Sequence, residues 1–148
     1  MNPSPVTAKS QTRADYQHFL AIPTRWMDND IYGHINNVNY YSFFDTAVNH
    51  YLIKAGVLDI HGGSIVGFVV ETSCQYFRPI SFPDVVTAGI RVAQLKDRSV
   101  RYEIGLFRND DSEVSAAGYF VHVYVDRASG RPTAIPDEAR DALRRLLV

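Results

Sequence analysis

The spacing of hydrophobic and polar positions predicts mainly β-strands in the second half of the chain. Apolar and polar side chains alternate there with a period of two, which places every second residue on the same face of a strand. The pattern occupies four segments, at 65–77, 84–95, 100–106 and 115–126. Turn-forming residues at 96–99 and 109–112 join the later strands, and these connections are too short for the crossovers of parallel strands. We therefore expect antiparallel hairpins.

A segment with helical spacing lies between these four strands and an earlier, shorter strand, which is predicted at 18–26. Pro23 in the short strand indicates an edge or a bulge, because proline cannot donate to a sheet ladder. Apolar side chains then recur at intervals of three and four residues, which predicts one buried helical stripe. The stripe consists of Tyr40, Phe43, Phe44, Ala47, Val48, Tyr51, Leu52 and Ala55. Asn37 or Asn39 can cap its start, and Gly56 stands where helices commonly end.

The order of these elements predicts an α+β fold. A strand, a loop, a long helix and four more strands fit an antiparallel β-sheet wrapped around one long central helix. A short charged helix is expected to begin at Pro136. The length of 148 residues favours a single domain. We expect the polar segment 1–17 to be a flexible N-terminal lead-in, and the domain to span 18–148.

Composition narrows the possible partners. The chain has 15 basic and 16 acidic residues, a net charge of −1, so it has no basic excess for binding nucleic acid. Cys74 is the only cysteine, which excludes an intrachain disulfide and fits a reducing compartment. The longest stretch without polar side chains, 65–70, is far shorter than the roughly 20 residues of a membrane helix. We expect a cytoplasmic protein without nucleic-acid or membrane partners.

No metal site is expected either. The histidines do not follow a zinc spacing, and only one cysteine could join them. The pattern DxDxxG that begins at Asp28 lacks the oxygen ligands of a calcium loop, because Tyr32 and Asn39 occupy its fifth and twelfth positions. His122 lies between aromatic residues in a strand and is expected to be a hydrogen-bonded structural residue.

The loop 28–37 carries the densest set of polar groups. Asp28 and Asp30 are followed by a glycine, a histidine and two asparagines, residues that also suit a tight turn and a helix cap. A carboxylate beside an aromatic helix stripe would be partly desolvated, which raises its basicity. Amides near a helix N-terminus can stabilise an oxyanion. Together these groups would suit the hydrolysis of an activated acyl group.

The sequence RWMDNDIYGHINNVNY at 25–40 resembles the signature RWxDxDxxGHxNNxxY of the 4-hydroxybenzoyl-CoA thioesterase-like family of hotdog-fold acyl-CoA thioesterases. Weaker matches follow at 78–80, 83–84 and 135–138. The resemblance implies a single hotdog domain, in agreement with the pattern above. It also implies an acyl-CoA substrate, no cofactor beyond the coenzyme A of that substrate, and a homodimer or homotetramer with active sites at the dimer interface.

The resemblance assigns the catalytic carboxylate to Asp30, either as a general base on water or as a nucleophile that forms a transient anhydride. Asp28 would shape the loop. Gly33, His34 and Asn37 would shape the site and polarise the thioester carbonyl. Backbone amides near Gly33, or a helix end of the partner, would bind the oxyanion.

Substrate binding is expected at aromatic and basic side chains. The acyl group would lie along Tyr40, Tyr41, Phe44 and Tyr76. Candidates for the coenzyme A phosphates are Arg78, Arg98 and Arg127, each of which could also be an ordinary solvated charge. Glu71 is a further candidate, as an auxiliary carboxylate.

Two other functions remain open at this point. A hotdog module could bind an acyl thioester without hydrolysing it, although Asp30 argues against this. A dehydratase acting on a 3-hydroxyacyl thioester would use a histidine in the catalytic loop, and His34 keeps that reading open. Release of free thiol from acyl-CoA would separate a hydrolase from both alternatives.

Overall fold

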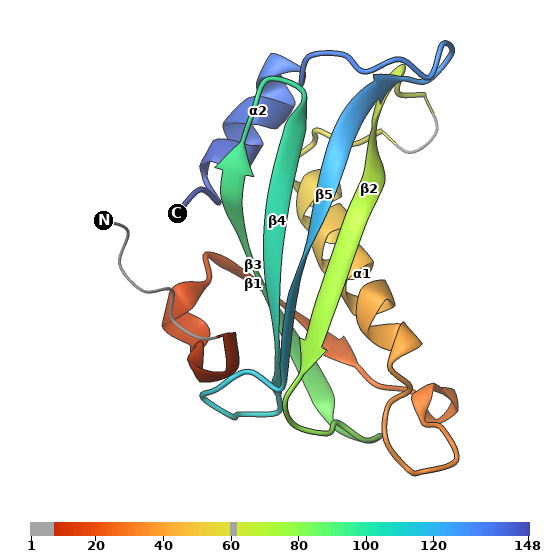
Figure 1. Cartoon of the computed structure of the whole chain (residues 1–148), viewed down its shortest axis with the longest axis vertical. Helices are drawn as coiled ribbons and strands as arrows, with labels where there is room; N and C mark the ends of the chain where they lie inside the picture. The colour runs from red at the N-terminus through yellow and green to blue at the C-terminus, as the bar shows by residue number, and fades with distance from the viewer. Residues whose placement is uncertain (1–7, 60–61) are drawn as a thin grey trace.

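The computed structural model describes residues 8–59 and 62–148, and in them five strands form one antiparallel sheet (Figure 1). The strands are β1 (His18–Pro23), β2 (Ile65–Tyr76), β3 (Val85–Leu95), β4 (Ser99–Arg108) and β5 (Ala116–Asp126). Their order across the sheet is β1-β3-β4-β5-β2. The helices are α1 (Val38–Lys54) and α2 (Asp137–Arg144).

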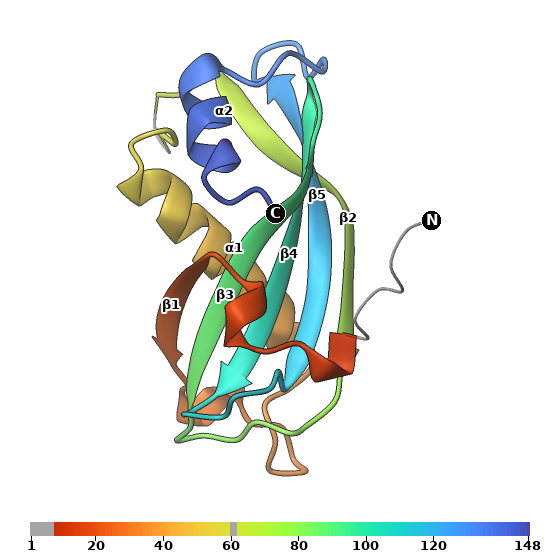
Figure 2. The same cartoon turned by 90° about the vertical axis from the view of Figure 1, so that its left-hand side faces the viewer.

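Helix α1 lies along one face of the sheet, which we call the inner face (Figure 2). Its apolar stripe is buried there: Phe44 and Val48 have no exposed surface, and they belong to the same core cluster as Val86 and Ile104 of the central strands. This arrangement confirms the predicted hotdog fold. No helix in the described ranges is long and apolar enough to cross a membrane.

The ends of α1 follow their local sequence. Asn37 occupies the N-cap position, and Gly56 follows the helix with a φ of 76°, a conformation that glycine adopts without steric cost. At the far end, the Tyr51 hydroxyl donates to the Ala142 carbonyl at 2.7 Å and joins α1 to α2.

Strand β1 is shorter than predicted. It ends at Pro23, and Trp26–Asp28 form a 3₁₀ turn instead of continuing the strand. The turn is held because the Arg25 N–H donates to the Asp28 carboxylate at 2.8 Å. Pro23 does lie in an edge strand, as predicted.

Strand β2 forms the opposite edge of the sheet and, among the residues that the structure describes, is paired only with β5. Large apolar side chains on it are exposed, among them Phe68, Val69 and Val70. The register against β5 shifts between Val69 and Glu71, so Val70 is an extra residue in a β-bulge. The bulge turns Glu71 to the outer face, where it pairs with Val121.

The chain before β1 packs against the outer face from Ala8 onward. Two 3₁₀ turns, Ala8–Ser10 and Arg13–Asp15, lead to Tyr16, which is 5% exposed. Tyr16 belongs to a second, smaller core with Phe107. This part of the lead-in predicted as flexible is therefore packed, whereas residues 1–7 lie outside the described ranges.

Candidate active site

The loop between β1 and α1 is folded by its own polar groups and by the segment after β2. Gly33 has a φ of 81°, and its N–H donates to the Asp30 carbonyl at 3.1 Å. The Asp30 N–H donates to the His34 carbonyl at 2.8 Å, which closes a tight turn. The Ile35 N–H donates to the Ile80 carbonyl at 2.7 Å, and the Ser81 hydroxyl donates to the Gly33 carbonyl at 2.8 Å. These bonds fix the loop against the end of the sheet.

Asp28 is the structural carboxylate of this loop. It is 3% exposed, and its carboxylate accepts hydrogen bonds from the Arg25 backbone and guanidinium. Burial alone would raise the pKa of Asp28, but the hydrogen bonds from Arg25 outweigh it and hold the pKa below its usual value. Its backbone carbonyl accepts from the Asn36 N–H and the Asn39 side chain. Asp28 therefore ties the turn to the first residues of α1.

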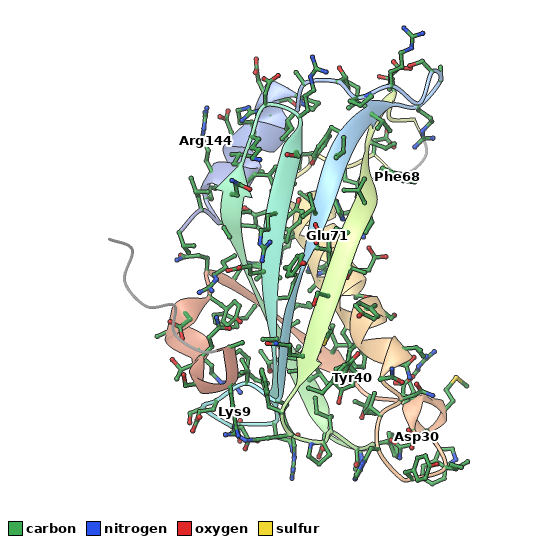
Figure 3. All side chains as sticks on the ribbon, in the orientation of Figure 1. Lys9, Asp30, Tyr40, Phe68, Glu71 and Arg144 are labelled. Atoms are coloured by element: carbon green, nitrogen blue, oxygen red, sulfur yellow. The ribbon has the colours of Figure 1, made fainter. Side chains whose placement is uncertain are left out.

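Asp30 has a different environment. Its side chain is half-buried, and one carboxylate oxygen accepts the Tyr32 N–H at 2.8 Å. The other oxygen has no hydrogen-bond partner within residues 8–59 and 62–148. Figure 3 shows Asp30 in the loop beyond the start of α1, near Tyr40. Asp30 is thus oriented by one amide and keeps one oxygen available for a water molecule or a substrate.

An open hollow of about 430 Å³ lies beside Asp30. Six predicted site residues line it: Asp30, His34, Asn37, Tyr40, Tyr76 and Arg78. Three residues not singled out as site residues complete the wall: Ile35, Phe77 and Pro79. Ile35 lies within the motif at 25–40 and Pro79 within the weak match at 78–80, whereas no sequence signal pointed to Phe77. The hollow therefore combines a carboxylate with aromatic walls.

Two tyrosines form the aromatic side of the hollow. The rings of Tyr40 and Tyr76 lie 4.8 Å apart, and the Tyr76 hydroxyl donates to the Asn37 carbonyl at 3.1 Å. Burial raises the pKa of Tyr40 to about 12 and also raises the pKa of Tyr76. Both hydroxyls are therefore neutral donors at physiological pH.

Two backbone amides at the hollow are available as donors. The N–H groups of His34 and Asn37 have no hydrogen-bond partner among the described residues, and both residues line the hollow. The Gly33 N–H, by contrast, is used within the turn. Gly33 shapes the loop through its positive φ but does not line the hollow.

Tyr41 and Phe44 lie away from the hollow beside Asp30. Tyr41 lines a separate hollow further along α1, together with Val69 of β2. Phe44 is fully buried in the core, and its ring lies 2.8 Å from the position that a Cβ on Gly118 would occupy. A helical stripe cannot by itself distinguish core residues from pocket walls, and the structure places Phe44 in the core.

The basic candidates are spread over both ends of the sheet. Arg78 is at the hollow, and its guanidinium contacts Glu113 at 3.3 Å. Arg98 precedes β4 and Arg127 follows β5, at the end of the sheet opposite the Asp30 loop (Figure 1). Of these three candidates, Arg78 alone lines the hollow beside Asp30 in the described part of the chain.

Glu71 lies outside the site. Its carboxylate accepts the Tyr119 hydroxyl at 2.7 Å, and the Tyr119 ring stacks under Arg101 on the outer face. The proposed role of Glu71 as an auxiliary carboxylate is therefore wrong for the hollow of its own chain, since the β-bulge turns it away.

Cys74 is placed as an inert thiol. It is partly buried, and burial raises its pKa to about 11, so it carries no thiolate character at physiological pH. In the described part of the chain, no group of three or more histidine, cysteine or acidic side chains is placed to hold a metal ion.

Comparisons with known proteins assign the chain to a family. A sequence model of the thioesterase-like superfamily matches residues 24–143. The uncharacterised protein YsmA of Bacillus subtilis (strain 168) is 21% identical over 131 residues, which cover 88% of each chain. The crystal structure of PA5185 from Pseudomonas aeruginosa PAO1 is 57% identical with a TM-score of 0.91, covering 93% of this chain and 96% of its own.

A solved structure with a named substrate is also similar. The gentisyl-coenzyme A thioesterase BH1999 is 26% identical with a TM-score of 0.76, and the match covers 85% of this chain and 99% of that one. The superfamily match includes the loop of Asp30, helix α1 and the whole sheet from β2 to β5. The chain therefore belongs to the thioesterase-like superfamily of hotdog-fold enzymes.

Proposed function

We propose that this thioesterase hydrolyses an acyl-CoA thioester to a carboxylic acid and free coenzyme A, with Asp30 as the catalytic carboxylate. The observation that carries the proposal is the unpartnered oxygen of Asp30 at the edge of an aromatic hollow. The similarity to a gentisyl-coenzyme A thioesterase supports a coenzyme A thioester as the substrate class.

In the proposed reaction the thioester carbonyl lies beside Asp30. As a general base, Asp30 takes a proton from water while the water oxygen attacks the carbonyl carbon. The tetrahedral intermediate then expels coenzyme A, which receives the proton. As a nucleophile, Asp30 would attack the carbonyl carbon and expel coenzyme A as its thiolate, which leaves a mixed anhydride. Water would then hydrolyse the anhydride to the carboxylic acid and regenerate Asp30, and its proton would go to the thiolate. Both routes use only water and this carboxylate, so no cofactor is required.

The developing oxyanion needs donors, and the free amides of His34 and Asn37 are proposed for this role. A donor of this kind is typically worth about 3 kcal/mol in the transition state. Tyr40 and Tyr76 would hold the start of the acyl group. The exposed imidazole of His34 would shape the entrance.

We infer that two copies pair through β2. This strand is an open edge with exposed apolar side chains, which is an unstable surface unless another chain covers it. In an antiparallel pair of β2 strands, the Ile65 end of one copy lies beside the Tyr76 end of the other. Arg127 adjoins the Ile65 end, because its N–H donates to the Ser64 carbonyl at 2.8 Å. The dimer would therefore bring Arg127 of one copy toward the Asp30 hollow of the other.

The test is thiol release from a panel of acyl-CoA thioesters by the wild type and by Asp30→Asn. We expect the substitution to lower kcat/KM by about two to four orders of magnitude, since it removes the base or nucleophile but keeps the shape. The matched control is Asp141→Asn, at an exposed carboxylate on α2, which should keep wild-type kcat/KM.

Two outcomes would contradict the proposal. Near wild-type kcat/KM in Asp30→Asn would remove Asp30 from the mechanism. Binding of acyl-CoA without any thiol release by the wild type would identify a binding module instead. Circular dichroism and the melting temperature establish that the variants are folded.

A further inference from the structure

Three hollows follow one another along the seam between α1 and β2. The first is the hollow of Asp30, with Tyr40 and Tyr76 in its wall. The second is lined by Tyr41, Ser42, Asp45, Val69, Thr72 and Phe120. The third is lined by residues of the last turns of α1 and the first residues of β2, such as Leu52 and Ile65. Lining positions thus rise along α1 while they fall along β2, so the three separate hollows lie in series along this seam.

The third hollow is the most enclosed and the smallest, at about 70 Å³. Its lining is mostly apolar, from Leu52, Val57, Leu58, Ile65, Val66 and Gly67. His122, Asn49 and Tyr124 supply its polar groups. The space is sufficient for the end of a chain-like ligand or for a few water molecules.

His122 is the unusual residue of this cavity. It is 4% exposed, and its Nε2 has no hydrogen-bond partner among the described residues. The expected hydrogen-bonded structural histidine is therefore not what the structure shows. One ring face stacks on Phe120, with centroids 4.7 Å apart, and Tyr102 meets the ring edge-on. On the cavity side, Nδ1 lies 3.0 Å from the position that a Cβ on Gly67 would occupy.

The imidazole is neutral in this environment, because burial lowers its pKa from 6.5 to about 4. A neutral imidazole offers one N–H donor and one lone-pair acceptor. Nε2 has almost no accessible surface, so a ligand in the cavity meets Nδ1, which also has no hydrogen-bond partner among the described residues. A ligand group that bonds to Nδ1 would gain affinity, because a buried polar atom without a partner is unfavourable. A hydroxyl group can both donate and accept, whereas a carboxylate would bring an unpaired charge into an apolar cavity.

We propose that this cavity is the far end of the acyl site, and that His122 there selects an acyl chain bearing a hydroxyl group near its end. The inference rests on the proposed acyl-CoA hydrolysis, since the chain enters from the hollow of Asp30. From Tyr40 to Asn49 helix α1 rises by about 13 Å, so the substrate class is a medium-length hydroxyacyl thioester.

The test compares two acyl-CoA thioesters of the same medium chain length, one plain and one hydroxylated next to its terminal carbon. For the wild type we expect kcat/KM to be about tenfold higher for the hydroxylated substrate, which corresponds to about 1.4 kcal/mol. In His122→Leu the imidazole is replaced by an apolar side chain of similar reach, so the preference should disappear or reverse.

A second variant, Gly67→Ala, tests the same inference if His122→Leu does not fold. Gly67→Ala adds a methyl group against the ring and narrows the cavity, so kcat/KM should fall for the hydroxylated chain. The matched control is Val123→Ala, next to His122 on β5 but on the outer face, which should retain the tenfold preference. Circular dichroism and melting temperature report the folding of each variant.

The outcomes separate this inference from the proposed function. If the wild type hydrolyses both substrates equally well, or if His122→Leu keeps the preference, the cavity holds buried water only and the inference is overturned. If the wild type hydrolyses no acyl-CoA at all, the proposed function itself fails.

Discussion

At the scale of single residues, the two aspartates of the loop differ in their hydrogen bonds, and this difference supports the separate roles proposed for them. Asp28 is buried and saturated by Arg25, whereas Asp30 is half-buried and keeps one oxygen free. The motif alone assigned catalysis to Asp30 by resemblance. The structure adds a physical reason, because a saturated, buried carboxylate is a poor base and a poor nucleophile.

The role of Asp28 can be tested through stability. Asp28→Asn removes a buried charge-assisted pair, so the free energy of unfolding should fall by about 1–3 kcal/mol at pH 7, as measured by urea denaturation. The pKa of Asp28 is lowered in the folded state, so its contribution is present above the ordinary value of 3.8. The contribution is lost as the pH falls through the folded-state pKa, and the two proteins should converge below that point.

The control for this measurement is Asp110→Asn, at an exposed carboxylate in the turn after β4, where a surface substitution should change stability by less than about 0.5 kcal/mol. A constant difference between wild type and Asp28→Asn from pH 7 down to about pH 2 would show that the ionised pair is not its source.

At the scale of elements, the hydrophobic pattern predicted most of the sheet because β3, β4 and β5 each have a buried face. It predicted the stripe of α1 for the same reason. It could not predict that Glu71 faces outward, because Val70 is inserted as a bulge and inverts the alternation beyond it. Nor could it place Tyr41, which lies beside the stripe, or Phe44, which belongs to it, because only tertiary packing separates the core from the hollows along α1.

The edge strand β2 makes a prediction about association. Val70→Lys places a charge at the bulge of the open edge, where Val70 is 55% exposed. We expect a shift from dimer to monomer in light scattering coupled to size-exclusion chromatography, because a charge would be buried without a partner. Ile53→Lys, at a 45% exposed side chain on α1, is the matched control and should remain dimeric. A wild type that is monomeric at micromolar concentration would contradict pairing through β2.

At the scale of the whole molecule, the position of Arg127 can be related to the Asp30 hollow only when two copies of the chain are considered. Arg127 and the Asp30 hollow are at opposite ends of one chain, yet they approach each other in the proposed antiparallel dimer. Sequence spacing could not show this relation, because it depends on which strand is left open at the edge of the sheet.

Arg127→Ala is therefore expected to raise KM for acyl-CoA by about tenfold with little change in kcat, since an arginine binds a phosphate without taking part in the chemistry. Arg98→Ala provides the comparison. Arg98 precedes β4, which is separated from the β2 edge by β5, and its removal should leave KM unchanged. Equal effects of the two substitutions would show that general surface charge, and not the dimer geometry, governs coenzyme A binding.

The packing of Tyr16 has a consequence for how dimers could stack into tetramers. Its ring occupies the space above Gly89 and Gly105, where any added Cβ would collide with it. The N-terminal segment thus covers the lower part of the outer face, while Phe68 remains open further along β2 (Figure 3). Two dimers meeting sheet to sheet would have to be offset toward the Phe68 end, and deleting residues up to Tyr16 would open a second way to stack. The packed segment from Ala8 to Tyr16 would then limit the assembly to one geometry.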